Sequence, residues 1–230
     1  MLHWKGETGA IRNARPETFT RGTTVGSATD IIGLMGACMT FERDAEIFAE
    51  DEPAEYIYRV VSGAVRFSKL MSDGRRQIGA FYLAGDVFGL ETEGLHSFSA
   101  ESIGRSQILF VTRSAFLAEA MRDQTLVLWT ETAEHLQRAQ THMLLLGRKN
   151  AQERIMGFLL DMTARQRSSG PIELPMSRQD IADYLGLTIE TVSRTLTQLE
   201  RDGVISIPVA RRIVLRNRTT LDEMNDCWAA

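Results

Sequence analysis

The hydrophobic pattern over residues 39–113 consists of short apolar or alternating runs separated by turn residues. Two such runs are Tyr56–Val61 and Gln107–Val111, and two of the turn signals are Ser62-Gly63 and Asp73-Gly74. An Asp-Gly pair favours a tight hairpin because both of its positions tolerate a positive φ. Strands at this spacing are typical of a β-sandwich or a β-barrel. The sequence therefore predicts a β-domain in this part of the chain.

The pattern changes to a helical period after residue 113, and the longest helical stretch is 123–147. It contains no proline, and its only glycine is the last residue. Apolar residues recur in it at steps of three and four, which is the heptad pattern of a coiled coil. A helix this long beside a small β-domain favours pairing with a second copy; packing on its own domain is the alternative. The predicted dimer seam consists of Leu126, Trp129, Ala133, Leu136, Gln140, Met143 and Gly147.

Residues 174–204 show two short amphipathic helices joined by a glycine turn. Ser177 is the predicted N-cap of the first helix, and Thr188 is the predicted N-cap of the second. Gly186 supplies the turn between them. The apolar stripes are Ile181 and Leu185 in the first helix, and Val192, Leu196 and Leu199 in the second. This arrangement predicts a helix-turn-helix, and the alternating residues 204–216 that follow add the hairpin of a winged helix.

The second of these helices presents a polar face that suits the bases of DNA. Arg194 offers two parallel donors to guanine O6 and N7, and Glu190 can accept from the amino group of cytosine or adenine. Ser193 can bond a base edge or a phosphate, and its small size allows a close approach. The alternative is an exposed salt bridge between Glu190 and Arg194, worth only ~0.3–0.5 kcal/mol. We predict base recognition by these three residues near the start of a recognition helix.

Charge supports an anionic partner for this part of the chain. Residues 148–218 contain 12 Lys and Arg against 8 Asp and Glu, although the whole chain has a net charge of −4. A basic block on an acidic body suggests nucleic acid as the partner of that block alone. Phosphate positioning needs donors around the recognition helix. The candidates are Ser177, Arg178, Thr188, Thr191, Thr197, Arg201, Arg211 and Arg212.

Composition excludes several classes of protein. The hydrophobic share of 43% and the charged share of 24% exclude a wholly disordered or fibrous chain. No stretch approaches ~18 consecutive apolar residues, and the first residues lack the apolar core of a signal peptide, so we expect a cytoplasmic protein with no membrane partner. Residues 1–27 lack periodicity and predict a disordered arm. Two cysteines, Cys38 and Cys227, build neither a disulfide framework nor a zinc site.

From about residue 28 to residue 218 the chain resembles the cAMP receptor protein/FNR family of bacterial transcription regulators. The most specific stretches are residues 147–160 and the helix-turn-helix over residues 174–204; Tyr56–Val65 and Gly85–Gly89 look like the β-roll signatures of the family. The resemblance implies an N-terminal β-roll, a long dimerisation helix and a C-terminal winged helix. It also implies a homodimer that binds an inverted repeat in double-stranded DNA and contacts RNA polymerase, usually for activation.

The match favours the FNR and FixK branches of the family. Their recognition helix carries Glu-x-x-Ser-Arg, which here is Glu190, Ser193 and Arg194. The cAMP receptor branch has an additional arginine just before the glutamate, where this chain has Ile189. The resemblance therefore implies a TTGA-type half-site.

The chain departs from the family in places that bear on cofactors. The N-terminal cysteine cluster that FNR-type oxygen sensing needs is absent, and Cys38 with Cys227 are too few ligands for an iron–sulfur cluster. Cyclic-nucleotide binding needs an Arg-Ser pair on the phosphate, where this chain has Phe98-Ser99. We therefore expect neither cAMP nor a cluster, and no cofactor at all. Turn glycines near the first roll strands are replaced by Ala45 and Asp51.

The predicted architecture is α+β. Its parts are the arm 1–27, a β-roll sensor-like domain 28–122, a dimerisation helix 123–147 and a winged helix-turn-helix domain 148–230. The leading hypothesis is a DNA-binding regulator that needs no effector. The second is the same fold gated by an unidentified small molecule or by oxidation of Cys38 or Cys227. The remote third is a cupin-like metalloenzyme, but the roll offers His96 alone for a metal, and we expect no enzyme.

Overall fold

The computed structural model describes residues 28–91, 94–123, 125–166 and 170–216. These residues form two compact units. The first unit takes in residues up to 66 together with residues 81–134, and the second takes in residues 67–80 and those from 135 onward. The arm predicted for residues 1–27 lies outside the described residues, and so does Cys227.

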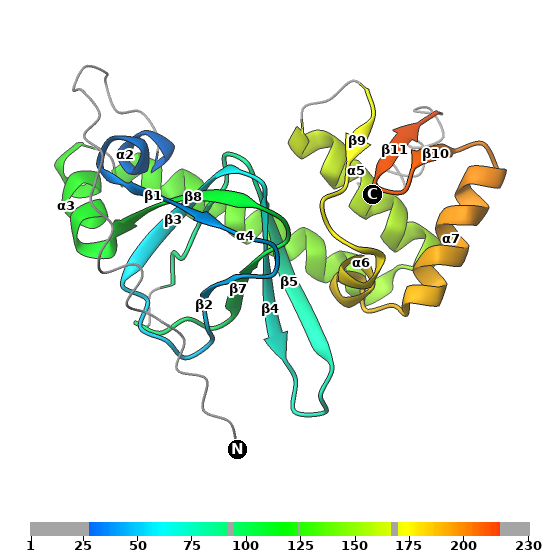
Figure 1. Cartoon of the computed structure of the whole chain (residues 1–230), viewed down its shortest axis with the longest axis horizontal. Helices are drawn as coiled ribbons and strands as arrows, with labels where there is room; N and C mark the ends of the chain where they lie inside the picture. Colours follow the sequence, from blue (N-terminus) through cyan, green and yellow to red (C-terminus); the bar gives the residue numbers. More distant parts are fainter. Residues whose placement is uncertain (1–27, 92–93, 124, 167–169, 217–230) are drawn as a thin grey trace. The chain divides into compact units, whose positions relative to one another are not determined.

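The β-domain contains strands β1 (Ala37–Phe41), β2 (Glu46–Phe48), β3 (Tyr56–Ser62), β4 (Ala64–Leu70), β5 (Arg76–Leu83), β6 (Val87–Phe88), β7 (Ser99–Ser102) and β8 (Ser106–Thr112). Among the described residues these strands form two four-stranded sheets, in the orders β1-β8-β3-β6 and β2-β7-β4-β5 (Figure 1). The widest pairing is between β3 and β8, which run antiparallel from Tyr56 opposite Thr112 to Ser62 opposite Gln107. The strands predicted from the apolar runs are confirmed as a two-sheet roll.

The turns of the roll explain several of the turn residues in the sequence. Gly63 has a φ of +86°, and a Cβ there would lie 2.7 Å from the Cα of Ser106, so the position requires glycine. Gly74 has a φ of +83°, as its predicted hairpin turn requires. Asp51 has a φ of +65°, and the other left-handed residue nearby is Asp44, with a φ of +59°. In the turn before β2, the left-handed residue is therefore Asp44. Its neighbour Ala45 does not need a positive φ, so alanine is tolerated at that position.

Two helices pack beside the sheet that contains β3 and β8. They are α2 (Ala28–Met35) and α3 (Arg113–Asp123). Ile31 and Ile32 of α2 and Phe116 of α3 are fully buried in one apolar cluster with Ile57 and Val111 of the sheet. Burial of side chains of this size contributes about 1.5–3 kcal/mol each. This cluster holds the two helices to the sheet.

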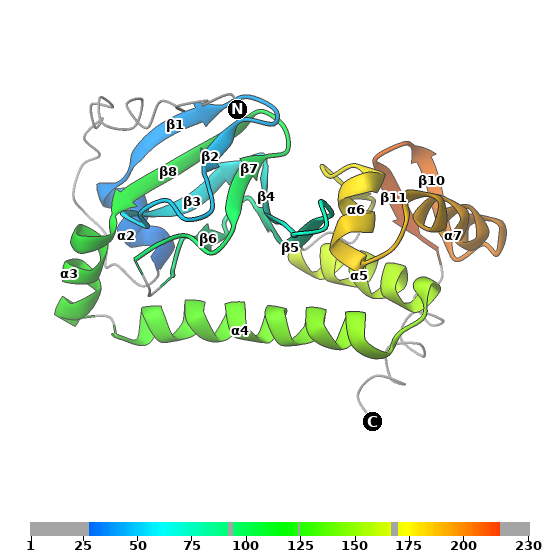
Figure 2. The ribbon, with the colours of Figure 1, turned by 90° about the horizontal axis from the view of Figure 1, so that it is seen from below.

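The helix α4 (Thr125–Arg148) is one uninterrupted helix of 24 residues (Figure 2). It occupies the stretch in which the sequence predicts a helix over residues 123–147, with ends that differ by one or two residues. No helix within the described ranges is both long and apolar enough to cross a membrane.

The C-terminal module consists of α5 (Ala151–Gln166), β9 (Ile172–Glu173), α6 (Arg178–Leu185), α7 (Ile189–Arg201), β10 (Ile205–Val209) and β11 (Arg212–Leu215). The predicted hairpin is confirmed as β10 and β11, which pair antiparallel. It gains a third strand, β9, on the β11 side, and the pattern of the sequence did not predict that strand. The core is made by the buried faces of the three helices, including Phe158, Leu185 and Val192.

Candidate nucleic-acid interface

The start of α7 is fixed by a local cap. Thr188 has extended backbone angles, and its hydroxyl accepts a hydrogen bond from the backbone N–H of Thr191 at 3.2 Å. The two threonine hydroxyls are also hydrogen-bonded to each other at 3.0 Å. An N-cap of this kind contributes about 1 kcal/mol to a helix. The predicted cap is confirmed, and it sets where the first turn of the helix points.

The two faces of α7 divide between the core and the solvent. Val192, Leu196 and Leu199 are buried, as their spacing predicts. Glu190 and Arg194 are exposed, and Ser193, which lies between them in the sequence, is half-buried. The three side chains predicted to read bases therefore lie on the outer side of the first two turns. Thr197, also exposed, donates its hydroxyl hydrogen to the carbonyl of Ser193 at 2.9 Å.

Glu190 is held in its charged form. Its pKa is lowered by a hydrogen bond from its own backbone N–H, by the Thr188 hydroxyl and by the nearby charge of Arg194. Among the described residues no ion pair joins Glu190 to Arg194, so the alternative of a surface salt bridge is not formed. Neither group is held by the other.

The first helix of the motif begins with a capping box. The Ser177 hydroxyl accepts from the backbone N–H of Asp180 at 3.0 Å, and the Asp180 carboxylate accepts from the backbone N–H of Ser177 at 2.9 Å and from its hydroxyl at 2.7 Å. Ser177 thus uses both of its hydrogens inside the cap, and it positions the start of α6. The other oxygen of Asp180 accepts from Arg76 at 2.7 Å, and Arg76 also pairs with Asp183 at 2.8 Å.

Arg154 of α5 joins three helix ends of the same unit. Its Nε donates to the carbonyl of Lys149, its Nη1 to that of Leu185 and its Nη2 to that of Leu146, each at 2.9 Å. Gly186 follows Leu185 in a left-handed conformation, with a φ of 61°, and closes α6. The last carbonyls of a helix have no partner within the helix. Arg154 supplies that partner for α4 and α6 at once, and so fixes the turn before α7.

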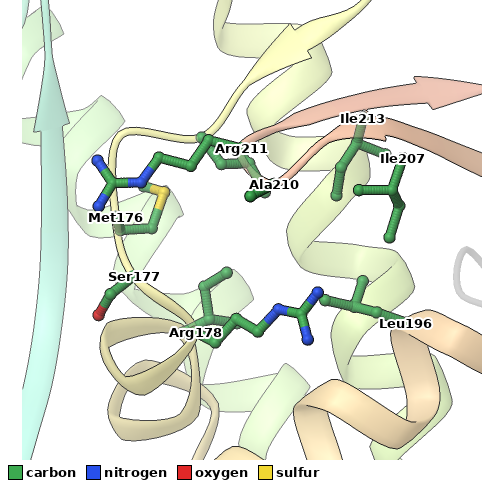
Figure 3. Close-up of a pocket in the computed structure, with 10 residues that line it drawn as sticks. Met176, Ser177, Arg178, Leu196, Ile207, Ala210, Arg211 and Ile213 are labelled. Atoms are coloured by element: carbon green, nitrogen blue, oxygen red, sulfur yellow. The ribbon is translucent and has the colours of Figure 1, made fainter.

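The predicted phosphate-positioning residues fall into separate places. Ser177, Arg178 and Arg211 line one cavity of about 210 Å³ between α6, α7 and the hairpin (Figure 3). Thr188 and Thr191 lie at the start of α7, beside Glu190. Arg201 is exposed at the opposite end of α7. Arg212 is exposed on β11, and its Nε lies 3.5 Å from the Glu173 carboxylate.

The predicted dimer seam is open to solvent. Trp129 is 72% exposed, Leu136 58% and Met143 64%, and Ala133 and Gln140 are exposed as well. Leu126 lies on α4, and its side chain is outside the described set. Large apolar side chains this exposed along one helix mark an interaction surface.

The β-domain does not fit a cyclic-nucleotide phosphate. Phe98 stands where an arginine would be needed, and the Ser99 hydroxyl accepts the backbone N–H of Glu50 at 3.0 Å. The Arg113 guanidinium donates to the carbonyls of Ala54, Gly89 and Glu91. Burial raises the pKa of Glu91, but its hydrogen bond with His96 and nearby positive charge outweigh this and lower it overall. A charged carboxylate in this loop would repel a phosphate.

His96, the histidine that the metalloenzyme hypothesis depends on, is a packing residue. Its ring is 1% exposed and is stacked on Phe48 with 3.5 Å between ring centroids. Its Nδ1 lies 3.2 Å from the Glu91 carboxylate. Within the described part of the chain, no three His, Cys, Asp or Glu side chains form a group that could hold a metal ion.

Comparison with known proteins agrees with both halves of this structure. Residues 38–123 match the cyclic nucleotide-binding domain, and residues 153–224 match the Crp-like helix-turn-helix domain. The chain is 50% identical over 202 residues to the nitrogen fixation regulation protein FixK of Azorhizobium caulinodans, which covers 85% of this chain and 82% of that protein. It is 46% identical over 167 residues to the transcriptional activatory protein AadR of Rhodopseudomonas palustris, with 70% of each chain covered. The solved structure of FixK2 from Bradyrhizobium japonicum matches with a TM-score of 0.79 and 52% identity, over 83% of this chain and 98% of that one.

The fold and the interface together define a winged-helix transcription regulator that binds DNA through its helix-turn-helix. This chain belongs to the CRP/FNR family, in its FNR/FixK branch. The family is one of regulators and not of enzymes, which excludes the cupin-like alternative.

Several residues that shape the interface were not predicted from the sequence. Asp180 is one of them, although a serine followed three residues later by an acid is the signal of a capping box. Arg154 lies within the stretch 147–160 that resembles the family, but nothing local in the sequence indicates its hydrogen bonds. No local signal identified Arg76, because its carboxylate partners are more than 100 residues away in the sequence.

Proposed function

We propose that this chain is a homodimeric transcription activator that reads an inverted repeat of TTGA-type half-sites. The observation that carries this proposal is the outward face of the capped helix α7, with Glu190 charged, Arg194 exposed and Ser193 between them. The arginine suits guanine, and the carboxylate suits the amino group of cytosine or adenine. No salt bridge between Glu190 and Arg194 has to break before either group meets a base.

The exposed seam on α4 supports pairing of two chains. Heptad pairing through Leu126, Trp129, Ala133, Leu136, Gln140 and Met143 would bury the apolar side chains that one chain leaves in water. Two recognition helices on a two-fold axis reach half-sites about 34 Å apart on one face of DNA. Contact with RNA polymerase then follows from the family role as an activator, and such a regulator acts in the cytoplasm, where the DNA is.

Phosphate positioning is assigned to three groups of donors. Arg178 and Arg211 would contact the backbone beside the hairpin, with Ser177 holding α6 in place. Thr188 and Thr191 would act at the start of α7, and Thr197 along it. Arg201 and Arg212 would steer the surface by charge. Contacts of this kind fix register and give affinity without base preference.

DNA binding in this proposal needs neither cAMP nor an iron–sulfur cluster. The poor fit of the β-domain to a nucleotide phosphate supports the first point, and the shortage of cysteines supports the second. The second candidate is gating by thiol oxidation or by an unidentified small molecule. Cys38 favours it, because this thiol is free and exposed on β1.

The test is DNA binding by the purified full chain, measured by fluorescence anisotropy in air with a labelled TTGA-type inverted repeat. We expect tight binding without any addition, unchanged by cAMP or by a thiol oxidant. A requirement for cAMP would contradict the reading of the β-domain. Loss of binding on oxidation, restored by a reductant, would favour the gated alternative.

A substitution separates base reading from general affinity. Arg194→Ala should cost about 1–3 kcal/mol per half-site and remove the preference for the half-site guanine. Arg201→Ala is the matched control, and it should weaken binding to intact and guanine-substituted sites by the same factor. If the R194A variant kept the wild-type guanine preference, the assigned readout would be wrong.

A further inference from the structure

The end of the hairpin formed by β4 and β5 belongs to the same compact unit as the helix-turn-helix. Residues 67–80 fall within the second unit, whereas the first residues of β4 and the last residues of β5 fall within the first unit. Both strands are neighbours in the sheet β2-β7-β4-β5 of the β-domain. The hairpin is therefore a continuous piece of the β-domain whose end is part of the DNA-binding unit.

One arginine of this hairpin holds two carboxylates of α6. Arg76 donates from Nε to Asp183 at 2.8 Å and from Nη2 to Asp180 at 2.7 Å. The side chain of Asp180 is 4% exposed and that of Asp183 is 13% exposed. Charge-assisted hydrogen bonds are strong, and shielding from water strengthens them further. The rigid fork of the guanidinium holds both carboxylates at once, so this contact is stronger than an exposed ion pair.

The hairpin meets the C-terminal module at α6 and leaves the recognition helix accessible. A cleft of about 830 Å³ lies between the hairpin and the start of α7, and its lining includes Gln77, Thr188 and Glu190. Glu190 and Arg194 are both exposed. The contact at Arg76 therefore restrains the module without covering the face that is proposed to read bases.

We propose that Arg76 is a positioning residue that sets which spacing between half-sites this regulator accepts. The chain passes between the two units in β4, in β5 and in α4. By binding α6, Arg76 makes the hairpin a second mechanical connection beside α4. Two connections at different places resist rotation of a module better than one. The proposal rests on the proposed function, in which the two modules of a dimer read half-sites on one face of DNA.

The spacing between half-sites is sensitive to such a rotation because DNA is a helix. One base pair more or fewer turns one half-site relative to the other by about 34–36° and shifts it by about 3.4 Å. A module that turns to follow this change strains or breaks the two hydrogen bonds of Arg76. Loss of such bonds corresponds to an affinity that is lower by about tenfold. Base preference within a half-site does not change, because Glu190 and Arg194 keep their places on α7.

The test uses the full chain and a series of TTGA-type inverted repeats that differ only in spacer length, one base pair at a time. Fluorescence anisotropy gives the affinity for each repeat. In Arg76→Ala, we expect the ratio of affinities between the preferred spacer and its neighbours to fall by about tenfold, with the preference for the half-site guanine unchanged. Arg76→Lys keeps the charge without the fork and should give an intermediate ratio. Arg75→Ala is the matched control and should keep the wild-type ratio, because Arg75 pairs with Asp73 inside the hairpin.

The other outcomes contradict the proposal. An unchanged ratio in R76A would show that Arg76 does not set the spacing. Equal weakening at every spacer would mean that Arg76 only stabilises α6, and tighter binding at every spacer would mean that its contact opposes DNA binding. Asp183→Asn is a second variant, which leaves Asp180 and its capping box in place and should lower the ratio in the same direction.

A measurement without DNA tests the second connection by itself. Spin labels are placed by Arg105→Cys in the β-domain and Arg201→Cys on α7, both at exposed positions, in a chain whose Cys38 and Cys227 are replaced by serine. Labelled chain is diluted with unlabelled chain, and pulsed electron resonance gives the distribution of the distance between the two labels. Arg76→Ala should broaden this distribution, and an unchanged width would refute the connection. Failure of the wild-type chain to bind any repeat would refute the proposed function, and the distance distribution would still decide the role of Arg76 in holding the module.

Discussion

Removing the Arg154 side chain should loosen the whole recognition module without touching its DNA-facing residues. In the folded chain this guanidinium gives one hydrogen bond to each of three carbonyls, at Leu146, Lys149 and Leu185. Two of these carbonyls belong to the last turns of α4 and α6, where the helix provides no partner. Arg154→Ala leaves all three carbonyls without their donor.

The magnitude follows from the number of bonds and their exposure. Hydrogen bonds to a charged group contribute about 1.5–3 kcal/mol each when they are well shielded. Arg154 is half-buried, so water replaces part of each lost bond, and we expect a total loss of about 3 kcal/mol. Arg154→Lys keeps the positive charge and a single donor group, and should cost about 2 kcal/mol because one ammonium cannot reach three carbonyls.

Native-state hydrogen exchange measures this effect within one part of a two-unit protein. The amides of Ile181 and Val192, bonded to Ser177 and Thr188, report the opening of the helix-turn-helix. A loss of about 3 kcal/mol accelerates their exchange by roughly two orders of magnitude. Arg201→Ala, an exposed arginine of α7, should change it by less than about 0.5 kcal/mol. Wild-type protection of both amides in the R154A variant would refute the reasoning.

Three further outcomes follow from the structure. Leu136→Asp, on the exposed seam of α4, should leave the circular dichroism of the chain unchanged but yield monomers in analytical ultracentrifugation; a dimer would show that the seam is not the interface. Asp180→Ala removes the capping box and leaves Arg76 with Asp183 alone, and should lower the free energy of unfolding by about 1–2 kcal/mol more than Asp183→Ala does, seen as a lower melting temperature. Burial lowers the pKa of His142, so its neutral form stabilises the fold at pH values above about 6.5, and this contribution is lost as the pH falls below that value. His142→Phe should make the free energy of local opening near Tyr184, obtained from hydrogen exchange, less dependent on pH between about 7.5 and 5.5. An unchanged slope of that free energy against pH would contradict this.

Features encoded by neighbouring residues could be predicted from the sequence. The caps at Ser177 and Thr188 and the turn at Gly186 depend on side chains within three or four positions, and the structure shows all three. The strands of the roll could be predicted for the same reason. Each strand has its own alternation of apolar and polar residues and its own flanking turn residues. The third strand of the wing, β9, has only two residues, too few for a period to be visible.

Contacts between distant segments could not be predicted in the same way. The pairing of Arg76 with Asp180 joins residues 104 positions apart, and either residue alone looks like a surface charge. Arg154 also gave no signal, because its partners are backbone carbonyls, which every residue carries. The absence of an ion pair between Glu190 and Arg194 among the described residues is likewise a property of the folded chain. Their spacing of four residues favours a salt bridge in an isolated helix.

The packing of the β-domain supports the proposal that DNA binding by this chain needs no nucleotide. An effector shifts a protein between states only by as much as it binds one of them better than the other. Here the loop that follows β6 is held by two hydrogen bonds from Arg113, to the carbonyls of Gly89 and Glu91, and by the pairing of Glu91 with His96, whose ring is stacked on Phe48. Those contacts come from the chain itself and are present at every ligand concentration. In the proposal a nucleotide gains little from this domain, because Phe98 stands where the resemblance to the family places an arginine for its phosphate. If a nucleotide does not control this protein, the second candidate, gating at the exposed Cys38 thiol, lies outside this loop.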